Sequence, residues 1–323
     1  MSDLLVHWAV YDDCRRLAQV DAQMSPLFRE WMQSERDAGR LGAVTRGGSR
    51  TLGVVLPWAR DRWPDESGDL PRKVAFVLGA LAHASADRLM KPLMSLCAGA
   101  NWDEIHHQMQ GRAAGDAERA EAEAGAVQEI SAYYEAHVFR QVYLSGAEEP
   151  FNRFLLADNA TAPGRALEEF VRALFQRALL ASHTLDPDSD DVQGWLDRLF
   201  STVQPLYLDV DLWVKVFQAP EPAKLERYLV ETAFYRGDDP AIRVARALQD
   251  GRHIDATQVQ AALQPDANES RYGQALETGM RCLRAASAFW QREIDWSALR
   301  ERLDAGRSPQ ETHPLKVPAP VAG

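Results

Sequence analysis

Apolar residues in this chain recur almost everywhere at the three- and four-residue spacing of an α-helix, and clean apolar–polar alternation is rare. Alanine and leucine dominate together with arginine, glutamate and glutamine, which all favour helices, whereas β-branched residues are sparse. Residues 206–217 are ambiguous, because their valines alternate but an aromatic-rich buried helix explains them equally well. The sequence therefore predicts an all-α, multi-helical bundle.

Prolines and glycines divide this pattern into separate helices. Gly39 is expected just past the end of the second helix, where glycine often terminates helices. Glycines in 41–50 and prolines with Gly68 in 61–71 predict loops. The helices are expected at 4–20, 26–38, 71–90, 116–144, 164–182, 188–204, 221–236, 239–250, 255–264 and 268–304.

The 323 residues are enough for about two domains. Glycine and proline concentrate in 145–164, which is the best boundary between two helical portions. We therefore predict a helical metal-site domain at 1–145 and a helical C-terminal domain at 146–306. The last residues, 307–323, hold four prolines and are expected to form a flexible tail.

Charge and cysteine content exclude several classes of protein. The net charge of −11 opposes general binding of nucleic acids or anionic membranes. The three cysteines are scattered and odd in number, which excludes a disulfide scaffold or a cysteine-based zinc finger. There is no apolar run of 18 residues and no basic segment of a secretory signal at the first residues. These features predict a soluble, cytoplasmic protein without a transmembrane segment.

The strongest local pattern for chemistry is His83 with Asp87. Their spacing of four places an imidazole and a carboxylate on one helix face, where they could share a metal ion. Gly79, Ser85 and several alanines surround them, and such small residues let neighbouring helices come close. A histidine and an aspartate at this spacing more often form a hydrogen-bonded pair without a metal.

Three further segments could supply ligands to the same site. His7 lies on the first predicted helix, Asp103 and His107 are also four residues apart, and an apolar segment at 53–61 ends in Asp61. Each segment also has a more ordinary explanation. His7 could be an imidazole at the edge of the core, the histidines at 106 and 107 an incidental pair, and Arg60 with Asp61 a charged pair on the surface.

Taken in order, these motifs resemble the zinc-dependent phospholipase C family. The order is an N-terminal His7, then Gly-x3-Pro followed by Asp61, then Phe-x-Leu-Gly-x-Leu-x-His-x3-Asp at 76–87 followed by Pro92, then a later histidine. The resemblance spans roughly 5–110 and implies an all-helical fold with a zinc cluster that activates water to attack a phosphodiester. It implies a ligand set of His7, Asp61, His83, Asp87 and His107, with His106 as the alternative to His107.

The chain also departs from the pattern of this family. Residues 62–82 contain no histidine, Leu93 stands six residues after Asp87, and no glutamate lies four residues after His106 or His107. One or two metal ions, or none, are therefore expected rather than three. Imidazole and carboxylate without thiolate suit zinc, with iron or manganese as alternatives. Asp61 and Arg60 are the predicted catalytic residues, Arg60 because guanidinium matches phosphate geometry, although a plain surface charge is an equal alternative.

The expected function is metal-dependent hydrolysis of a phosphodiester or phospholipid-type bond, with a small phosphate ester or a lipid headgroup as partner. The alternative is a non-catalytic helical interaction or scaffold protein with a degenerate metal site. A homodimer is a further expectation. Glu129, Tyr133 and His137 share a helix face and could line a pocket, but a core-facing stripe is preferred. Trp58 and Trp63 could rim the site, although core anchors are the simpler interpretation.

Overall fold

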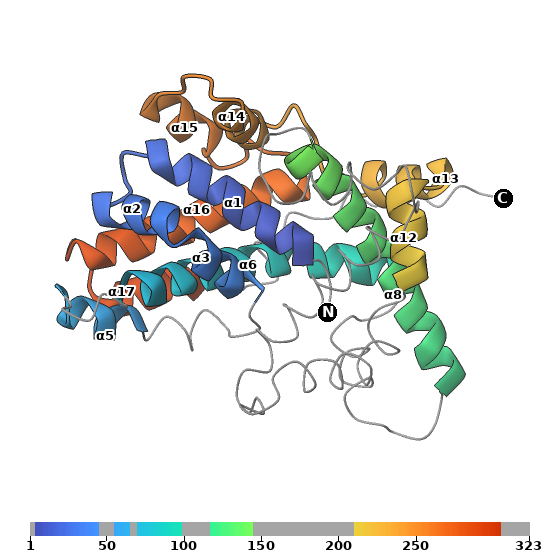
Figure 1. Ribbon diagram of the computed structural model, residues 1–323, viewed down its shortest axis with the longest axis horizontal. Helices are drawn as coiled ribbons and strands as arrows, with labels where there is room; N and C mark the ends of the chain where they lie inside the picture. Colours follow the sequence, from blue (N-terminus) through green and yellow to red (C-terminus); the bar gives the residue numbers. More distant parts are fainter. Residues whose placement is uncertain (1–3, 45–54, 65–69, 99–116, 145–209, 305–323) are drawn as a thin grey trace, which may run out of the picture. The chain divides into compact units, whose positions relative to one another are not determined.

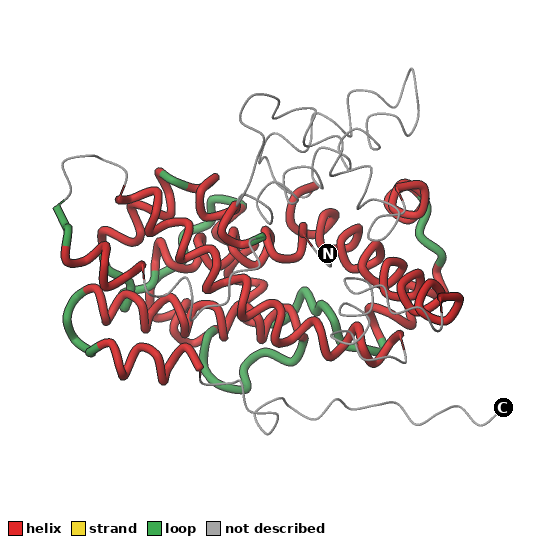
Figure 2. Tube along the Cα trace, turned by 90° about the horizontal axis from the view of Figure 1, so that it is seen from below, coloured by secondary structure: helices red, strands yellow, loops and turns green. Residues whose placement is uncertain are grey.

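A computed structural model describes residues 4–44, 55–64, 70–98, 117–144 and 210–304. Every secondary-structure element in these ranges is helical, and Figure 2 shows only helices joined by loops there. The predicted all-α class is thereby confirmed. Among the described helices, none combines the length and apolar character needed to cross a lipid bilayer.

The chain divides into two compact units. Unit 1 comprises 1–9 and 90–228, and unit 2 comprises 10–89 and 229–323. Unit 2 thus combines early and late parts of the sequence, which differs from a simple division near residue 145. That predicted boundary, and the helices expected at 164–182 and 188–204, lie outside the described residues and stay predictions.

The first three helices of unit 2 differ in part from the predicted pattern. Helix α1, Leu4–Val20, has the predicted bounds, with its first residues counted in unit 1. The predicted helix 26–38 is instead two helices, α2 at Pro26–Ser34 and α3 at Arg36–Ala43. Gly39 lies inside α3 and does not end a helix. A side chain at this position would collide with the phenol of Tyr11, so packing explains the glycine.

Helices α5, Val55–Asp61, and α6, Leu70–Ala98, follow. Helix α6 begins one residue before the predicted start and runs past Pro92, beyond the predicted end at Met90. Leu93 and Met94 after the proline are fully buried, so their packing offsets the hydrogen bond that proline cannot donate. The division between the units falls inside α6 as well as inside α1.

Residues 231–304 of unit 2, which the structure describes, form four helices, and the predicted long helix at 268–304 is interrupted at 291–295. The aspartate Asp239 stabilises this region, because its carboxylate accepts hydrogen bonds from the backbone of Glu269 and Ser270 at 3.0 and 2.9 Å. The helices are α14 at Pro240–Gln249, α15 at Ala256–Ala262, α16 at Arg271–Trp290 and α17 at Trp296–Asp304.

The core of unit 2 lies where α1, α6 and α16 run side by side (Figure 1). Cys14 on α1 donates to the carbonyl of Leu276 at 3.8 Å, and Ser85 on α6 donates to the carbonyl of Ala275 at 3.2 Å. Gly279 on α16 permits this approach, since an added Cβ would lie 2.8 Å from the Cys14 sulfur and 3.1 Å from the Ser85 hydroxyl. The three helices are therefore in close contact.

The described part of unit 1 centres on α8, Ala117–Val138, which continues as the π-helix η1, Phe139–Leu144. Its partner is α12, Val210–Gln218, so the ambiguous segment is helical from residue 210 onward, where the structure describes it. The buried Glu135 on α8 accepts hydrogen bonds from the Leu5 amide at 3.1 Å and from the Trp213 indole at 3.0 Å. Helix α13, Pro222–Leu225, and the π-helix η2, Glu226–Val230, replace the longer helix predicted at 221–236.

Candidate metal centre

His83 and Asp87 lie on the same face of α6, as their spacing predicts. His83 Nε2 and Asp87 Oδ2 are 3.4 Å apart, and the two side chains are 12% and 22% exposed. The pair is therefore largely shielded, yet a small ligand can still reach the carboxylate. A carboxylate beside an imidazole nitrogen is suited to binding either a shared proton or a shared cation.

The other ring nitrogen of His83 has a fixed partner. His83 Nδ1 lies 2.8 Å from the carbonyl oxygen of Ala43, the last residue of α3. A carbonyl oxygen only accepts, so this contact assigns the ring proton to Nδ1 in the neutral imidazole. The lone pair of Nε2 then points to Asp87, which is the tautomer that metal-ligating histidines commonly adopt.

Glycines bring α3 and α6 close enough for this contact. An added Cβ on Gly79 would lie 1.8 Å from the carbonyl oxygen of Gly39, and one on Gly42 would lie 1.9 Å from that of Phe76. Neither backbone oxygen can move aside as a flexible side chain could. The prediction that small residues near His83 permit close helix packing is confirmed at Gly79.

His7 on α1 is the third member of the candidate centre. One ligand atom from each of His7, His83 and Asp87 lies within 4.8 Å of the others, and no other such group occurs within the described ranges. His7 is buried, and it lies on the continuous helix α1 one turn before Val10. These residues are three of the five predicted ligands, and their binding of a metal stays a prediction.

The donor set fits a transition metal better than calcium or magnesium. Two imidazole nitrogens and one carboxylate oxygen suit zinc, iron or manganese, whereas the hard cations prefer oxygen ligands alone. Zinc holds such donors at roughly 2.0–2.2 Å, which separates them by about 3.4 Å in a tetrahedron. The His83–Asp87 separation of 3.4 Å already matches this spacing.

Asp61 is not a member of this group. It is the exposed last residue of α5. The preceding Arg60 donates to the carbonyl of Phe289 at 2.8 Å and stacks on the Phe289 ring at 3.9 Å. Phe289 lies about 21 Å along α16 from Ala275, the residue that Ser85 contacts. Arg60 therefore has an anchoring contact away from the pair, and the catalytic roles of Asp61 and Arg60 stay predictions.

His106 and His107 lie outside the described residues, so their predicted roles also stay predictions. The second candidate stripe, Glu129, Tyr133 and His137, belongs to the core of unit 1. The Tyr133 hydroxyl accepts from the Glu221 amide at 3.0 Å, and Glu129 pairs with Lys224. Burial, with a smaller effect of Arg140, lowers the pKa of His137 to about 4. These contacts support the preferred interpretation as a core-facing stripe.

Sequence reasoning missed a buried ionic network on α1. Asp12 is contacted by Arg40 through two nitrogens, and Asp13 pairs with Arg16 at 2.6 Å and with Arg246. Burial opposes ionisation of Asp12, but Arg40, Arg16 and Arg15 together hold the pKa of this carboxyl below its usual value. The adjacent acidic and basic pairs at 12–16 were the available signal, yet their partners come from distant helices.

Comparisons with protein-family models, with curated proteins and with solved structures found no match for this chain. The geometry of the candidate centre therefore carries the functional interpretation.

Proposed function

We propose that this protein is a metal-dependent hydrolase of a phosphodiester or phospholipid-type bond, with His7, His83 and Asp87 as metal ligands. The observation that supports the proposal most is the orientation of His83. Its Nδ1 is committed to the Ala43 carbonyl at 2.8 Å, which directs Nε2 toward Asp87. A ligand preoriented in this way loses little conformational freedom on binding a cation.

Zinc is the proposed ion, in one or two copies, with iron or manganese as alternatives. When bound, such a metal supplies Lewis acidity toward a phosphoryl oxygen and activates water for attack at phosphorus. The chain itself provides the donors and their surroundings. Buried His7 and the shielded His83 and Asp87 would hold the metal ion where water competes weakly for it. His107 is proposed as a further ligand, whereas the anchoring of Arg60 at Phe289, away from His83 and Asp87, gives the predicted roles of Asp61 and Arg60 no support.

The first test is the metal content of full-length protein purified without chelator. We expect near-stoichiometric zinc in the wild type and about a tenfold loss of affinity in His83→Ala and Asp87→Asn. His253→Ala is the matched control, because His253 is exposed on the loop before α15. The proposal would be refuted by a wild-type protein that contains only trace metal and by a metal content that is the same in His83→Ala.

The second test is hydrolysis of bis-p-nitrophenyl phosphate. The activity should disappear with a chelator, return with zinc, and be lost in Asp87→Asn while the circular dichroism spectrum is retained. Stoichiometric metal without any hydrolysis would instead favour the non-catalytic alternative. That alternative calls for a large exposed apolar patch in the second half of the chain, and within 210–304 only Val230 is a large, exposed apolar residue.

We also propose a reducing compartment such as the cytoplasm. Cys14, Cys97 and Cys282 are all described and form no disulfide with one another. Cys14 and Cys282 are buried. Burial raises the pKa of both thiols, which keeps them in the unreactive protonated form. Such thiols are typical of proteins kept under reducing conditions.

A further inference from the structure

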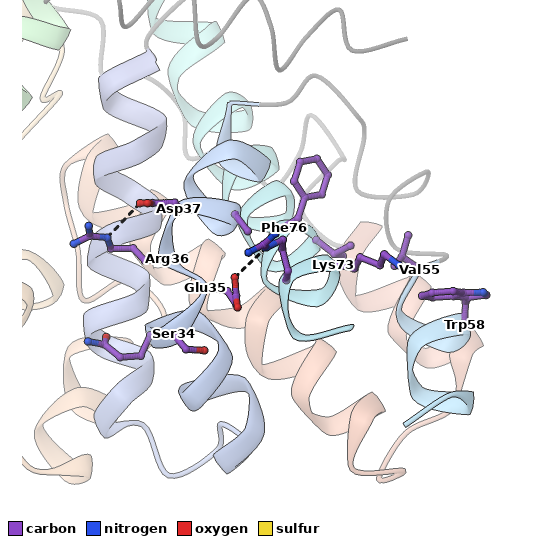
Figure 3. Close-up of a pocket in the computed structure, with 12 residues that line it drawn as sticks. Ser34, Glu35, Arg36, Asp37, Val55, Trp58, Lys73 and Phe76 are labelled. Carbon is purple, nitrogen blue, oxygen red and sulfur yellow. Dashed lines mark hydrogen bonds and ion pairs between the residues drawn. The ribbon is translucent and has the colours of Figure 1, made fainter. Parts of the chain in front are cut away.

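Unit 2 contains an open groove between the turn that joins α2 to α3, helix α5 and the start of α6. Its volume is about 1110 Å³, similar to the largest typical small-molecule sites. Figure 3 shows Trp58 of α5 and Lys73 and Phe76 of α6 around this groove, with Glu35 from the α2–α3 turn facing them. The groove is formed by described residues of a single unit.

The lining of the groove is apolar on one side. Val55, Trp58, Phe76 and Val77 contribute to it. Trp58 is 39% exposed, whereas most aromatic side chains in the described part of the chain are buried. An indole kept at the surface beside a groove is a common contact for the apolar body of a ligand.

Among the described residues that line the groove, the charges cancel except at Lys73. Arg72 pairs with Glu35 at 3.3 Å, and Arg36 pairs with Asp37 at 3.6 Å. Lys73 has no ion pair among the described residues, and its ammonium lies 5.4 Å from the centre of the Trp58 ring. Figure 3 shows the Lys73 side chain extending toward Trp58. The groove therefore offers one unbalanced positive charge next to its exposed aromatic ring.

This arrangement disfavours a cationic ligand. Aromatic rings attract cations, but the Trp58 ring already has Lys73 and, at 4.7 Å, the guanidinium of Arg62 near it. A second cation would meet two like charges, whereas an anion would be attracted by both. The charge distribution thus selects an apolar molecule that carries a single negative group.

We propose that this groove is a binding site for a small carboxylate with an apolar aryl or acyl body. The apolar body would contact Trp58 and Phe76, and the carboxylate would pair with Lys73. The site uses none of the candidate metal ligands, so it does not depend on the proposed hydrolase function.

The test is isothermal titration calorimetry of the full chain with 2-naphthoate and decanoate as aryl and acyl probes. Binding of either carboxylate is expected, whereas 2-naphthylmethanol and 2-naphthylmethylammonium should bind at least about tenfold more weakly. Absence of binding by both carboxylates at millimolar concentration would overturn the proposal. Equal binding of the ammonium compound would overturn it as well.

Two variants locate the site, and each has a matched control. Trp58→Ala and Lys73→Glu should weaken carboxylate binding by about tenfold or more. Trp63→Ala is the control for Trp58, because Trp63 is 37% exposed but does not line the groove. Arg29→Glu is the control for Lys73 as a charge reversal on α2 away from the lining. Equal losses in a variant and its control would contradict the assignment.

The exposed position of Lys73 keeps the test informative if Trp58→Ala fails to fold. Carboxylate binding should also be the same in His83→Ala and after chelation. That result separates the groove from the metal centre, since a failed hydrolase proposal leaves it intact. A carboxylate affinity that falls on chelation would show that the ligand binds at the metal and would refute the groove assignment.

Discussion

Arg40 of α3 donates hydrogen bonds from two side-chain nitrogens to Asp12 of α1 in the interior of unit 2. Arg40 Nε and Nη2 lie 3.1 and 2.6 Å from Asp12 Oδ2, and both side chains are almost entirely buried. Removing one partner leaves the other charge in a low-dielectric interior without its main compensation. The pair therefore ties α1 to α3 and makes the two positions strongly interdependent.

The first prediction concerns this interdependence. Arg40→Ala should lower the free energy of unfolding by about 3–5 kcal/mol, because it leaves the buried Asp12 carboxylate poorly compensated. The double variant Asp12→Leu/Arg40→Met should be less destabilised than Arg40→Ala. Urea unfolding followed by circular dichroism measures both. Lys215→Ala is a control at the exposed Lys215–Glu221 pair and should change little. Additive losses at Asp12 and Arg40 would contradict the predicted coupling.

The second prediction compares two helical glycines. Gly79→Ala should destabilise the protein by about 1–3 kcal/mol, because the new methyl group would meet the backbone oxygen of Gly39. Gly125→Ala in α8 should instead be neutral or stabilise by up to about 1 kcal/mol, since nothing lies within 4 Å of the added atom. Thermal unfolding of the two variants measures the contrast. Equal changes in stability in the two variants would show that α3 and α6 can move apart without destabilising the protein.

The third prediction concerns pH and His137. The pKa of this side chain in the folded protein is lowered to about 4, against 6.5 for an unperturbed histidine. Between these values the unfolded chain binds a proton that the folded protein does not, so stability falls as the pH drops below 6.5. From pH 7.5 to 5 this loss should be about 2 kcal/mol.

His137→Gln tests the third prediction because glutamine cannot ionise. Urea unfolding at pH 7.5 and pH 5 should show a smaller loss of stability in this variant than in the wild type. His253→Gln, at an exposed position, should retain the wild-type difference. The prediction is wrong if His137→Gln and the wild type lose equal stability over this range.

The fourth prediction concerns metal removal. A ligand that binds only the folded protein stabilises it by about 2.7 kcal/mol at a concentration one hundredfold above its Kd. Zinc at that excess should therefore raise the melting temperature of chelator-treated wild type, and a chelator should reverse the change. His83→Ala, with about tenfold weaker affinity, should show roughly half of this stabilisation, about 1.4 kcal/mol, whereas His253→Ala should respond like the wild type. A similar increase in all three proteins would indicate nonspecific binding of zinc.

Local sequence signals predicted much of the helical structure. Helix α1 and the pairing of His83 with Asp87 depend on helical periodicity alone, and both are confirmed. The predicted helix ends were wrong where tertiary packing overrides the local preference of a residue. Gly39 was expected to end a helix but lies inside α3, because a side chain there would collide with Tyr11. Pro92 was expected to follow a helix but lies within α6.

The candidate centre was predictable only in part. Residue types and their order indicated His7, His83 and Asp87, because these positions follow helical spacing and a recognisable succession of motifs. The Ala43 carbonyl that orients His83 could not be predicted, since it reaches the ring only through contact between α3 and α6. The groove beside Trp58 and Lys73 likewise combines three separate segments of the sequence.

The composition of unit 2 also has a consequence for biosynthesis. Asp13 and Cys14 on α1 contact Arg246, Tyr272 and Leu276, which belong to the last part of the chain. Roughly 140 residues separate the two segments of this unit, so a ribosome needs on the order of 10 s to deliver the second after the first. During that interval α1 has its contacts with the early helix α3 but lacks its partners on α14 and α16. A nascent-chain chaperone that covers this helix until α16 emerges would protect the polypeptide from aggregation.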